Sequence, residues 1–287
     1  MFVSLAGVTV GERSDDLMLS EFEPNFGSVR TGDAEWPLRD GSRPGADYLE
    51  AGTVTLTLRT RYGIRSRVEA DRATAAFMRA WRSSLRAAPG VLVPMTVGDE
   101  GWTRVVYGRA GRMSPPTPGT YLARRGFAEI IAEFRVLDPL VYDPVSTALS
   151  ISVVPKSLGG IIAPVITPVT TTLTSDTSYR VLSVTGEGPA PLAVTFHGPA
   201  TNPKILVGGV EVGLTGSLAY DEDVTVDGRS RTVTLSDGSS VATRLSRDSR
   251  LDRLIVDPGE HEIGFTATDR TGTARVTVEA TPTHYHL

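Results

Sequence analysis

Residues 130–144 constrain the fold more than any other segment, because an apolar stretch runs directly into two Asp-Pro steps. The segment reads Ile-Ile-Ala-Glu-Phe-Arg-Val-Leu-Asp-Pro-Leu-Val-Tyr-Asp-Pro. Each proline lacks an amide donor and moves the residue before it, Asp138 or Asp143, away from helical geometry, so regular strand pairing is interrupted twice. We interpret this stretch as the seam between two β-rich domains, residues 1–138 and 139–287.

Length and composition fit two folded domains and exclude several classes of protein. The chain has 287 residues, of which 40% are hydrophobic and 22% charged, enough for two domains of about 100 to 200 residues. The absence of cysteine excludes disulfides and thiolate chemistry. The net charge of -4 does not indicate nucleic-acid binding, and no apolar segment reaches the ~20 residues that span a bilayer. We expect no membrane segment and no specific nucleic-acid binding.

Residues 24–49 form the longest irregular segment of the first domain. Irregular segments of more than about 12 to 15 residues are uncommon in compact domains unless they bind something. The segment is either a long surface loop or an extended arm, and Trp36 at its centre indicates that it packs on a partner. Its turn-forming residues are Gly27, Gly32, Pro37, Gly41, Pro44 and Gly45.

The sequence Thr53–Arg67 predicts a β-hairpin that turns at residues 62–63. Val54, Leu56 and Leu58 share one face of the first strand, and polar side chains occupy the other face. This polar side is either an ordinary solvated face or a basic patch. Its arginines are Arg59, Arg61, Arg65 and Arg67.

One amphipathic helix is predicted, from Asp71 as its N-cap to Leu85, with residues 89–90 (Pro-Gly) as the stop signal. Phe77, Trp81 and Leu85 recur at four-residue spacing, so they form an apolar stripe that covers a sheet. The arginines of the helix lie in other directions, where they meet solvent or a neighbouring subunit. They include Arg79 and Arg82.

After the seam, the pattern changes to short apolar runs separated by turn residues. Strands of this length and spacing indicate a β-sandwich or jelly roll. Residues 156–178, which are rich in Pro, Thr and Ser, are predicted to be a loop or linker. The predicted fold class is therefore mainly β, with a β-rich N-terminal domain that carries one helix and a C-terminal β-sandwich.

No catalytic, cofactor-binding or metal-binding motif is recognisable in the chain. It has no nucleophile elbow, phosphate-binding loop or dinucleotide fingerprint. Residues 221–223 (Asp-Glu-Asp) and Asp227 offer oxygen ligands for calcium, but their spacing differs from that of an EF-hand loop. The sequence therefore predicts a protein that is not an enzyme and has no cofactor.

Several short motifs follow one another along the chain. They are the helix Asp71–Leu85 with Trp81, the junction Phe134–Tyr142, Gly188–Leu192 leading to Phe196–Gly198, Asn202–Ile205, and Leu254–Ile263. Each motif is short, and the signal lies in their order. In this order they resemble the distal tail protein family of long-tailed (siphovirus) bacteriophages, whose members are also called minor tail proteins.

The resemblance implies a structural protein of the virion that joins the tail tube to the tail-tip hub. The first domain would form the belt of a homo-oligomeric ring, usually a hexamer, and the second would be a galectin-like β-sandwich. The implied partners are the tail-tube protein, the tail-tip hub or tail-associated protein, the tape measure protein and the receptor-binding proteins. The implied location is the distal end of the phage tail, after assembly in the host cytoplasm.

Under this resemblance, residues 24–49 are an arm that reaches the next subunit of the ring. A heterologous contact that closes by rotation needs such reach, and aromatic and arginine side chains dominate interface energetics. The candidate interface residues are Trp36, Arg39, Arg59, Arg61, Arg65, Arg67, Arg79 and Arg82. The seam becomes a joint between the domains, built from Asp138, Pro139, Tyr142 and Pro144.

Two other functions stay open. A carbohydrate-binding or host-adhesion module would act through the second domain, if aromatic side chains were exposed on a face of the sandwich. A tail-tube subunit would share the ring and the first domain, but the second domain argues against it. The aromatic side chains available after residue 147 are Tyr179, Phe196, Tyr220, Phe265 and Tyr285.

Overall fold

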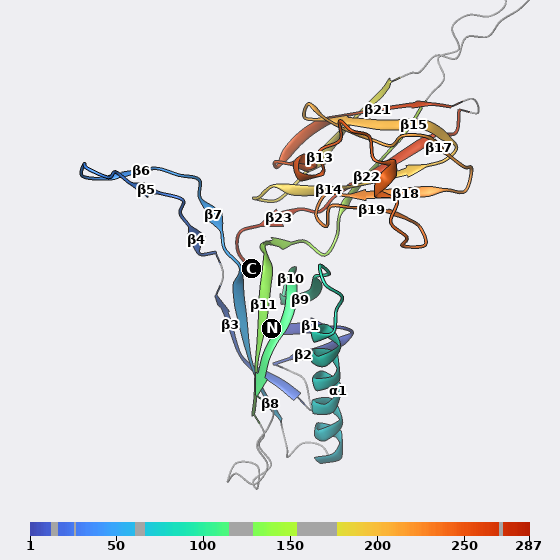
Figure 1. The fold of residues 1–287 in the computed structure, drawn as a ribbon. Coiled ribbons are helices and arrows are strands. Elements are labelled where there is room, and N and C mark those ends of the chain that lie inside the picture. Colours follow the sequence, from blue (N-terminus) through green and yellow to red (C-terminus); the bar gives the residue numbers. More distant parts are fainter. Residues whose placement is uncertain (13–16, 26, 61–66, 115–128, 154–176, 270–271) are drawn as a thin grey trace, which may run out of the picture. The chain divides into compact units, whose positions relative to one another are not determined.

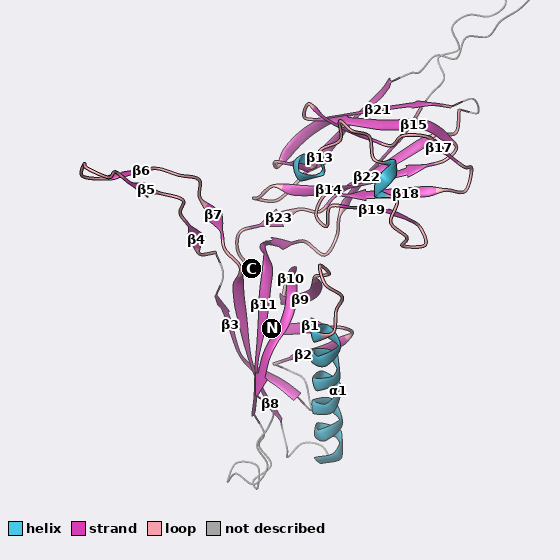
Figure 2. Cartoon of the chain, viewed as in Figure 1, coloured by secondary structure: helices cyan, strands magenta, loops and turns pink. Residues whose placement is uncertain are grey.

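The computed structural model describes residues 1–12, 17–25, 27–60, 67–114, 129–153, 177–269 and 272–287. Contacts divide the chain into two compact units, coloured along the sequence in Figure 1. The first unit comprises Met1–Pro144 and His284–Leu287, and the second comprises Val145–Thr283. The predicted fold class is confirmed, because strands dominate both units and the described residues contain a single α-helix (Figure 2).

The boundary between the units differs from the one predicted at residue 138. Strand β11, Glu129–Tyr142, continues past this position, so the first unit extends to Pro144. The end of the chain returns to the first unit as β23, Thr283–His284, which lies next to β11 in the sheet. The predicted linker, 156–178, lies outside the described residues except at its last two positions.

The first unit is built on one closed sheet. Its strand order is β10-β9-β1-β2-β3-β8-β11-β23, and β10 also pairs with β11, so the sheet closes on itself. The pairings among β1, β2, β3, β8, β9, β10 and β11 are antiparallel, except that β2 and β3 meet in parallel. The strands other than β11 and β23 are β1 (Phe2–Leu5), β2 (Val8–Gly11), β3 (Leu17–Asn25), β8 (Gly52–Thr60), β9 (Val93–Asp99) and β10 (Trp102–Ser114).

Helix α1, Arg67–Leu85, packs its aromatic side chains into the core of the first unit. The Phe77 and Trp81 ring centroids lie 5.6 Å apart, and the edge of Trp81 meets Phe134 of β11 at 6.3 Å. The predicted stripe is thus correct at these two positions but wrong at Leu85, which is 52% exposed because the helix ends there. The helix also begins before Asp71, which is therefore not its N-cap.

The predicted hairpin over 53–67 is wrong. The alternation of apolar residues identified the buried face of β8 correctly, but β8 pairs with β3 and β11, which are distant in sequence. Residue 67 already belongs to α1, and the predicted turn at 62–63 lies outside the described residues. Strand periodicity specifies which face is buried and does not specify the partner strand.

Residues 27–51 form an extended two-stranded ribbon, the arm. Within it, β4 (Val29–Arg30) pairs with β7 (Tyr48–Leu49), and β5 (Ala34–Glu35) pairs with β6 (Ser42–Arg43). Figure 1 shows this ribbon leaving the sheet between β3 and β8. Of the two predicted alternatives, surface loop or arm, the structure has the arm.

The second unit is a β-sandwich. One sheet has the order β12-β22-β14-β18-β19, with β20 beside β14, and the other has the order β13-β21-β15-β16, with β17 beside β15. Buried residues of both sheets form one core, in which Phe196 and Phe265 lie 6.4 Å apart. The strands are β12 (Thr147–Ser152), β13 (Thr177–Val184), β14 (Ala190–His197), β15 (Ala200–Val207), β16 (Val210–Gly213), β17 (Ser217–Leu218), β18 (Asp223–Asp227), β19 (Thr232–Leu235), β20 (Ile255–Val256), β21 (Gly259–Thr268) and β22 (Arg275–Ala280).

Two short 3-10 helices, Ala242–Arg244 and Leu251–Arg253, connect strands of the second unit. None of the helices in the described part of the chain is long and apolar enough to cross a membrane.

Candidate assembly surfaces

The arm is exposed along its whole length. Every residue from Gly27 to Ala51 lies on the surface, so no side chain of this ribbon is buried within its own chain. Two-stranded ribbons are at best marginally stable in water without a further packing surface. The arm therefore has the properties of a segment that packs against another molecule.

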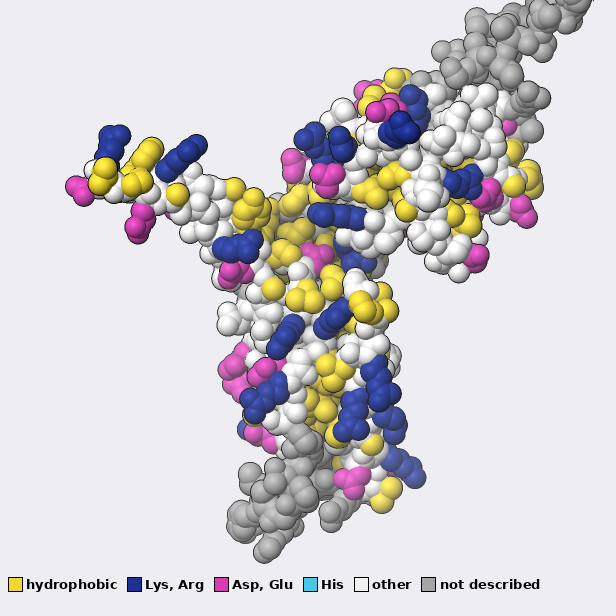
Figure 3. Space-filling model, in the orientation of Figure 1, with side chains coloured by type: hydrophobic (Ala, Val, Ile, Leu, Met, Phe, Trp, Pro, Cys, Tyr) yellow, Lys and Arg dark blue, Asp and Glu magenta, His cyan; other side chains and the backbone are white. Residues whose placement is uncertain are grey.

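Large apolar side chains are concentrated on the arm. Leu38 is 96% exposed and Tyr48 57% exposed, and hydrophobic and basic side chains alternate along the ribbon in Figure 3. Exposed apolar side chains that cluster in this way mark interaction surfaces. The full set comprises Val29, Trp36, Leu38, Tyr48 and Leu49.

Two arginines of the arm lie over aromatic rings. The Arg39 guanidinium carbon is 5.7 Å from the centre of the Trp36 ring, and that of Arg30 is 5.6 Å from the centre of the Tyr48 ring. At exposed positions such cation–π contacts each contribute about 0.5 to 1 kcal/mol. The predicted anchors Trp36 and Arg39 are thus brought together, whereas the second pair was missed. The sequence signal for this second pair is that Arg30 and Tyr48 lie at corresponding positions in the two halves of the arm, on either side of its turn.

The backbone fixes the shape of the arm near its middle. The Gly32 N–H donates to the Ala46 carbonyl at 3.1 Å, and Asp33 Oδ1 accepts from the Gly45 N–H at 2.9 Å. A Cβ atom at Gly45 would lie only 2.0 Å from the Gly32 carbonyl oxygen, so the two strands cross too closely for any side chain there. The ribbon is consequently a defined structural element rather than an irregular loop.

The predicted basic patch on residues 59–67 is not assembled on one hairpin. Arg59 lies on β8 and forms an ion pair with Glu129 of β11 at 2.9 Å. Arg67 belongs to α1, and its side chain, like Arg61 and Arg65, lies outside the described residues. A role of these arginines in subunit contacts stays a prediction.

The exposed side of α1 carries a line of arginines. Arg72 and Arg79 lie two helical turns apart, Arg82 lies beside Arg79, and Arg86 follows directly after the helix ends at Leu85. All four are exposed, and basic side chains follow the helix in Figure 3. The predicted interface residues Arg79 and Arg82 are therefore available to a partner that carries negative charge.

The predicted joint is a bulge within β11. Pairing with β10 passes from Val136 opposite Gly108 to Val141 opposite Val106, so residues 137–140 lie opposite a single residue, Tyr107. Proline is tolerated at such an irregularity because no ladder hydrogen bond is required there. Pro139 therefore sits inside the first unit and does not end it.

Asp138 holds the bulge in shape. Its Oδ2 accepts a hydrogen bond from the Tyr142 hydroxyl at 2.7 Å, and its Oδ1 accepts from the Leu140 N–H at 3.3 Å. The Tyr142 ring also meets Tyr107 edge-on, with centroids 5.1 Å apart. Three of the four predicted joint residues, Asp138, Pro139 and Tyr142, thus form one local structure.

Asp143 fixes the chain where it leaves the first unit. Arg104 Nη1 lies 2.6 Å from Asp143 Oδ1, and His284 Nε2 lies 3.3 Å from the same oxygen. Pro144, the remaining predicted joint residue, follows as the exposed last residue of this part of the unit. The outgoing and returning segments of the chain therefore lie side by side at one carboxylate.

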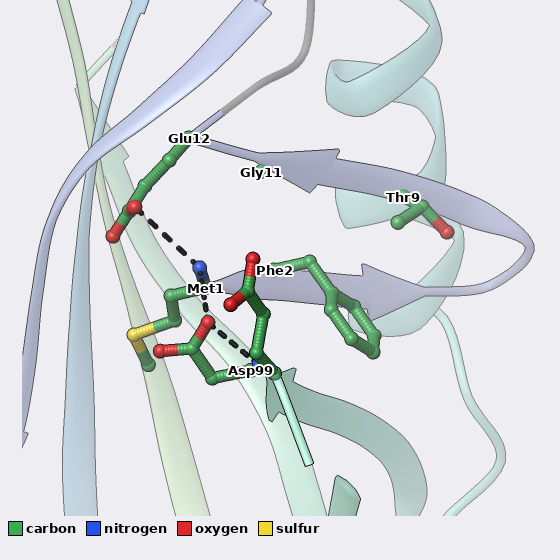
Figure 4. Close-up of a pocket in the computed structure, with 7 residues that line it drawn as sticks. Met1, Phe2, Thr9, Gly11, Glu12 and Asp99 are labelled. Atoms are coloured by element: carbon green, nitrogen blue, oxygen red, sulfur yellow. Dashed lines mark hydrogen bonds and ion pairs between the residues drawn. The ribbon is translucent and has the colours of Figure 1, made fainter. Parts of the chain in front are cut away.

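An open cavity of about 660 Å³ lies at the start of the sheet and is shown in Figure 4. Asp99 Oδ1 is 2.8 Å and Glu12 Oε2 3.6 Å from the Met1 amine. The hydrogen bond to Asp99 raises the pKa of this amine above its usual value of 8.0. The residues that line the cavity include no histidine, cysteine or lysine.

The acidic cluster that suggested calcium is occupied by protein partners. Glu222 pairs with Arg244, and Asp223 Oδ1 lies 2.8 Å from His197 Nδ1. Asp227 accepts hydrogen bonds from the Arg229 and Ser230 amides. Within the described ranges, no three histidine or acidic side chains converge on a point that could hold a metal ion.

Comparison with known proteins gives matches among solved structures. No protein-family model matches the sequence, and no curated protein matches it. The SPP1 Dit protein, described as a paradigm of the hub adsorption apparatus in phages that infect Gram-positive bacteria, matches with a TM-score of 0.59 and 15% identity over 98% of both chains. The chain has the fold of a Dit protein. Because the match covers nearly the full length of both chains, the Dit fold includes both units.

Two structures of the phage P2 baseplate in its activated conformation show the same fold. A chain of the form with calcium matches with a TM-score of 0.54 and 10% identity, over 94% of this chain and 91% of that one. A chain of the form with strontium gives the same TM-score and identity, over 98% and 96%. The resemblance inferred from the order of the motifs is thus supported at the level of the fold.

Proposed function

We propose that this chain is a structural protein of the bacteriophage tail tip, where it forms a ring that joins the tail tube to the tail-tip hub and the receptor-binding parts. The observation that carries the proposal is the Dit fold over 98% of the chain, combined with an arm that has no packing surface of its own. In this proposal the protein has no enzyme activity, and its chemistry is that of contacts between subunits.

The ring is proposed to be a hexamer in which each arm packs on the adjacent subunit. Such heterologous contacts use two different surfaces of each copy, and they close when the rotation per copy divides a full turn. The apolar side chains of the arm would supply the buried centre of the contact, with Trp36, Leu38 and Tyr48 as the largest contributors. The exposed arginines of α1, including Arg79 and Arg82, would contact either the next subunit or an adjoining tail protein.

Replacing residues 31–47 with Gly-Gly tests the arm directly. Arg30 and Tyr48 lie opposite each other at the base of the ribbon, so a two-residue turn can connect them. The full chain of 30.6 kDa is expected to give a hexamer of about 184 kDa in solution, and the shortened chain a monomer. The measurement is mass by light scattering after size exclusion.

A matched control is Val91→Ser, which alters an exposed apolar residue outside the arm. This variant is expected to keep the mass of the full chain, and circular dichroism checks that the shortened chain is still folded. A shortened, folded chain that forms the same ring would show that the arm does not hold the subunits together. A monomeric full chain would contradict ring formation by the chain alone.

A further inference from the structure

The outward face of the six-stranded sheet carries a continuous row of hydroxyl groups. Thr195 of β14 lies opposite Thr225 of β18 on one side and Thr277 of β22 on the other. Ser150 of β12 and Thr234 of β19 extend the row to both edges. The row therefore crosses five neighbouring strands with only serine and threonine, while the residues before and after Thr195, Thr225 and Thr277 are buried in the core.

A second row runs beside the first and consists of Arg275, His197 and Asp223. Hydrogen bonds connect side chains within and between the two rows. His197 Nδ1 lies 2.8 Å from Asp223 Oδ1, and His197 Nε2 lies 3.0 Å from Thr277 Oγ1. In the first row, the Thr195 and Thr225 hydroxyls share one hydrogen bond at 3.0 Å. Side chains connected in this way lose little further freedom when a ligand binds, which favours affinity.

Charge on this face is mainly negative. Within the hydroxyl row and the two rows that flank it, the carboxylates are Asp223, Asp227 and Glu279, and the cation is Arg275. The apolar side chains in these rows are Ala148 and Ala193, which bury little area. The buried centre of a protein interface is usually apolar, whereas hydroxyls and carboxylates suit a ligand that is itself rich in hydroxyl groups.

One rigid turn presents an aromatic ring beside these rows. Tyr220 occupies a turn closed by a hydrogen bond from the Glu222 N–H to the Ala219 carbonyl, and its side chain is 80% exposed. The Glu222 carboxylate accepts from the Ala219 N–H at 2.9 Å and pairs with Arg244. The turn is therefore held from within while its aromatic side chain faces solvent.

The turn adjoins the end of the second row. The Gly198 N–H, directly after His197, donates to the Glu222 carbonyl at 3.0 Å, and Asp223 begins β18. A Cβ atom at Gly198 would lie 1.7 Å from the Ala219 carbonyl oxygen, so the two segments are in close contact. Tyr220 consequently lies at the margin of the hydrogen-bonding face, where a ring can stack on a ligand that lies across the rows.

We propose that this face of the second unit is a binding site for neutral carbohydrate, with Tyr220 as the stacking platform and the rows of Thr195 and His197 as the hydrogen-bonding surface. Sugar hydroxyls donate to carboxylates and both donate to and accept from threonine hydroxyls, and the apolar side of a sugar ring packs on an aromatic face. The excess of carboxylates selects against sialic and uronic acids. This site goes beyond the structural role and does not depend on ring formation.

A glycan array tests the proposal with the full chain. The array carries neutral hexose and N-acetylhexosamine oligosaccharides together with sialylated and uronic-acid oligosaccharides, and the expected binding is confined to the neutral classes. For the best neutral oligosaccharide, Tyr220→Ala is expected to weaken binding by about tenfold or more. Thr195→Val, which removes one hydroxyl at nearly constant volume, is expected to weaken it by about threefold to tenfold.

Tyr179→Ala is the matched control, because Tyr179 is an exposed tyrosine on the other sheet. It should leave the affinity within about twofold of the unaltered chain, and thermal melting checks that each variant is folded. The proposal is overturned if no neutral glycan binds, if acidic glycans bind best, or if Tyr179→Ala weakens binding as much as Tyr220→Ala. It is equally overturned if Tyr220→Ala leaves glycan binding intact but prevents binding of a purified tail protein, which would make the turn a protein-docking element.

Discussion

At the residue scale, the acidic side chains singled out in the sequence as candidate joint residues or metal ligands stabilise local turns and bulges. Asp138 shapes the bulge of β11 through Tyr142, and Asp143 pairs with Arg104. Glu222 closes the turn that presents Tyr220. Their spacing in the sequence suggested a metal site or a domain seam, but carboxylates at turns commonly accept hydrogen bonds from nearby backbone amides.

Glu222 should make the stability of the protein depend on pH. The hydrogen bond from the Ala219 N–H, followed by the contact with Arg244, holds the pKa of Glu222 below its usual value of 4.5. A carboxyl group with a lowered pKa in the folded state stabilises the fold above its unfolded pKa, and this contribution is lost as the pH falls through the folded pKa. Glu222→Gln should therefore lower the Tm of the second unit at pH 7 by about 2 to 4 °C, and the difference should shrink below pH 4.5.

Thermal melts between pH 7 and pH 3 measure this effect. Glu262→Gln, at an exposed glutamate of β21, is the control and should change the Tm little at any pH. A difference between Glu222→Gln and the unaltered chain that stays constant over this range would contradict the role assigned to the ionised carboxylate.

At the element scale, sequence patterns specify which face of a helix or strand is buried, but they do not specify which strands pair. The four-residue spacing of Phe77 and Trp81 identified the buried side of α1, because helix periodicity is a local property. It failed at Leu85, where the helix ends and the core no longer covers it. The alternation in β8 likewise identified its buried face, but its partners β3 and β11 are remote in sequence and carry no local signal.

Trp81 is predicted to be the main contact between α1 and the sheet. It is fully buried, and its Nε1–H donates to the Gly111 carbonyl at 3.1 Å. Trp81→Ala should lower the free energy of unfolding of the first unit by about 3 to 5 kcal/mol. Trp81→Phe keeps most of the ring but leaves the Gly111 carbonyl without its donor, so a loss of about 1 to 3 kcal/mol is expected.

Urea unfolding followed by circular dichroism measures both changes. Leu85→Ala, at the exposed end of the same helix, should stay within about 0.5 kcal/mol of the unaltered chain. An equal loss at Leu85 and Trp81 would show that the helix is held by something other than its aromatic stripe.

Part of each candidate site could also be predicted from sequence. The irregular composition of residues 24–49 indicated the arm, and its aromatic and arginine content indicated Trp36 and Arg39. The hydroxyl row of the second unit could not be found in this way, because Thr195, Thr225 and Thr277 are far apart in the chain and each resembles an ordinary solvent-facing strand residue. Only the register of three strands brings them together.

At the scale of the whole molecule, the two units are consistent with a division of labour. The first unit carries the exposed arm and the exposed arginines of α1, which are the contact surfaces of the proposed ring. The second unit is a separate sandwich with its own core and a polar outward face. The Dit fold spans both units, and the proposed ring contacts and the proposed carbohydrate site lie on different units of that fold.

The most direct test of the central claim is the position of the protein in phage particles. A short affinity tag inserted after Gly238, in an exposed turn of the second unit, can be labelled with nanogold and located by electron microscopy. The proposed tail-tip ring predicts a single cluster of label at the distal end of the tail. Label along the whole tail would identify a tail-tube subunit instead, and particles without label would contradict a place in the virion.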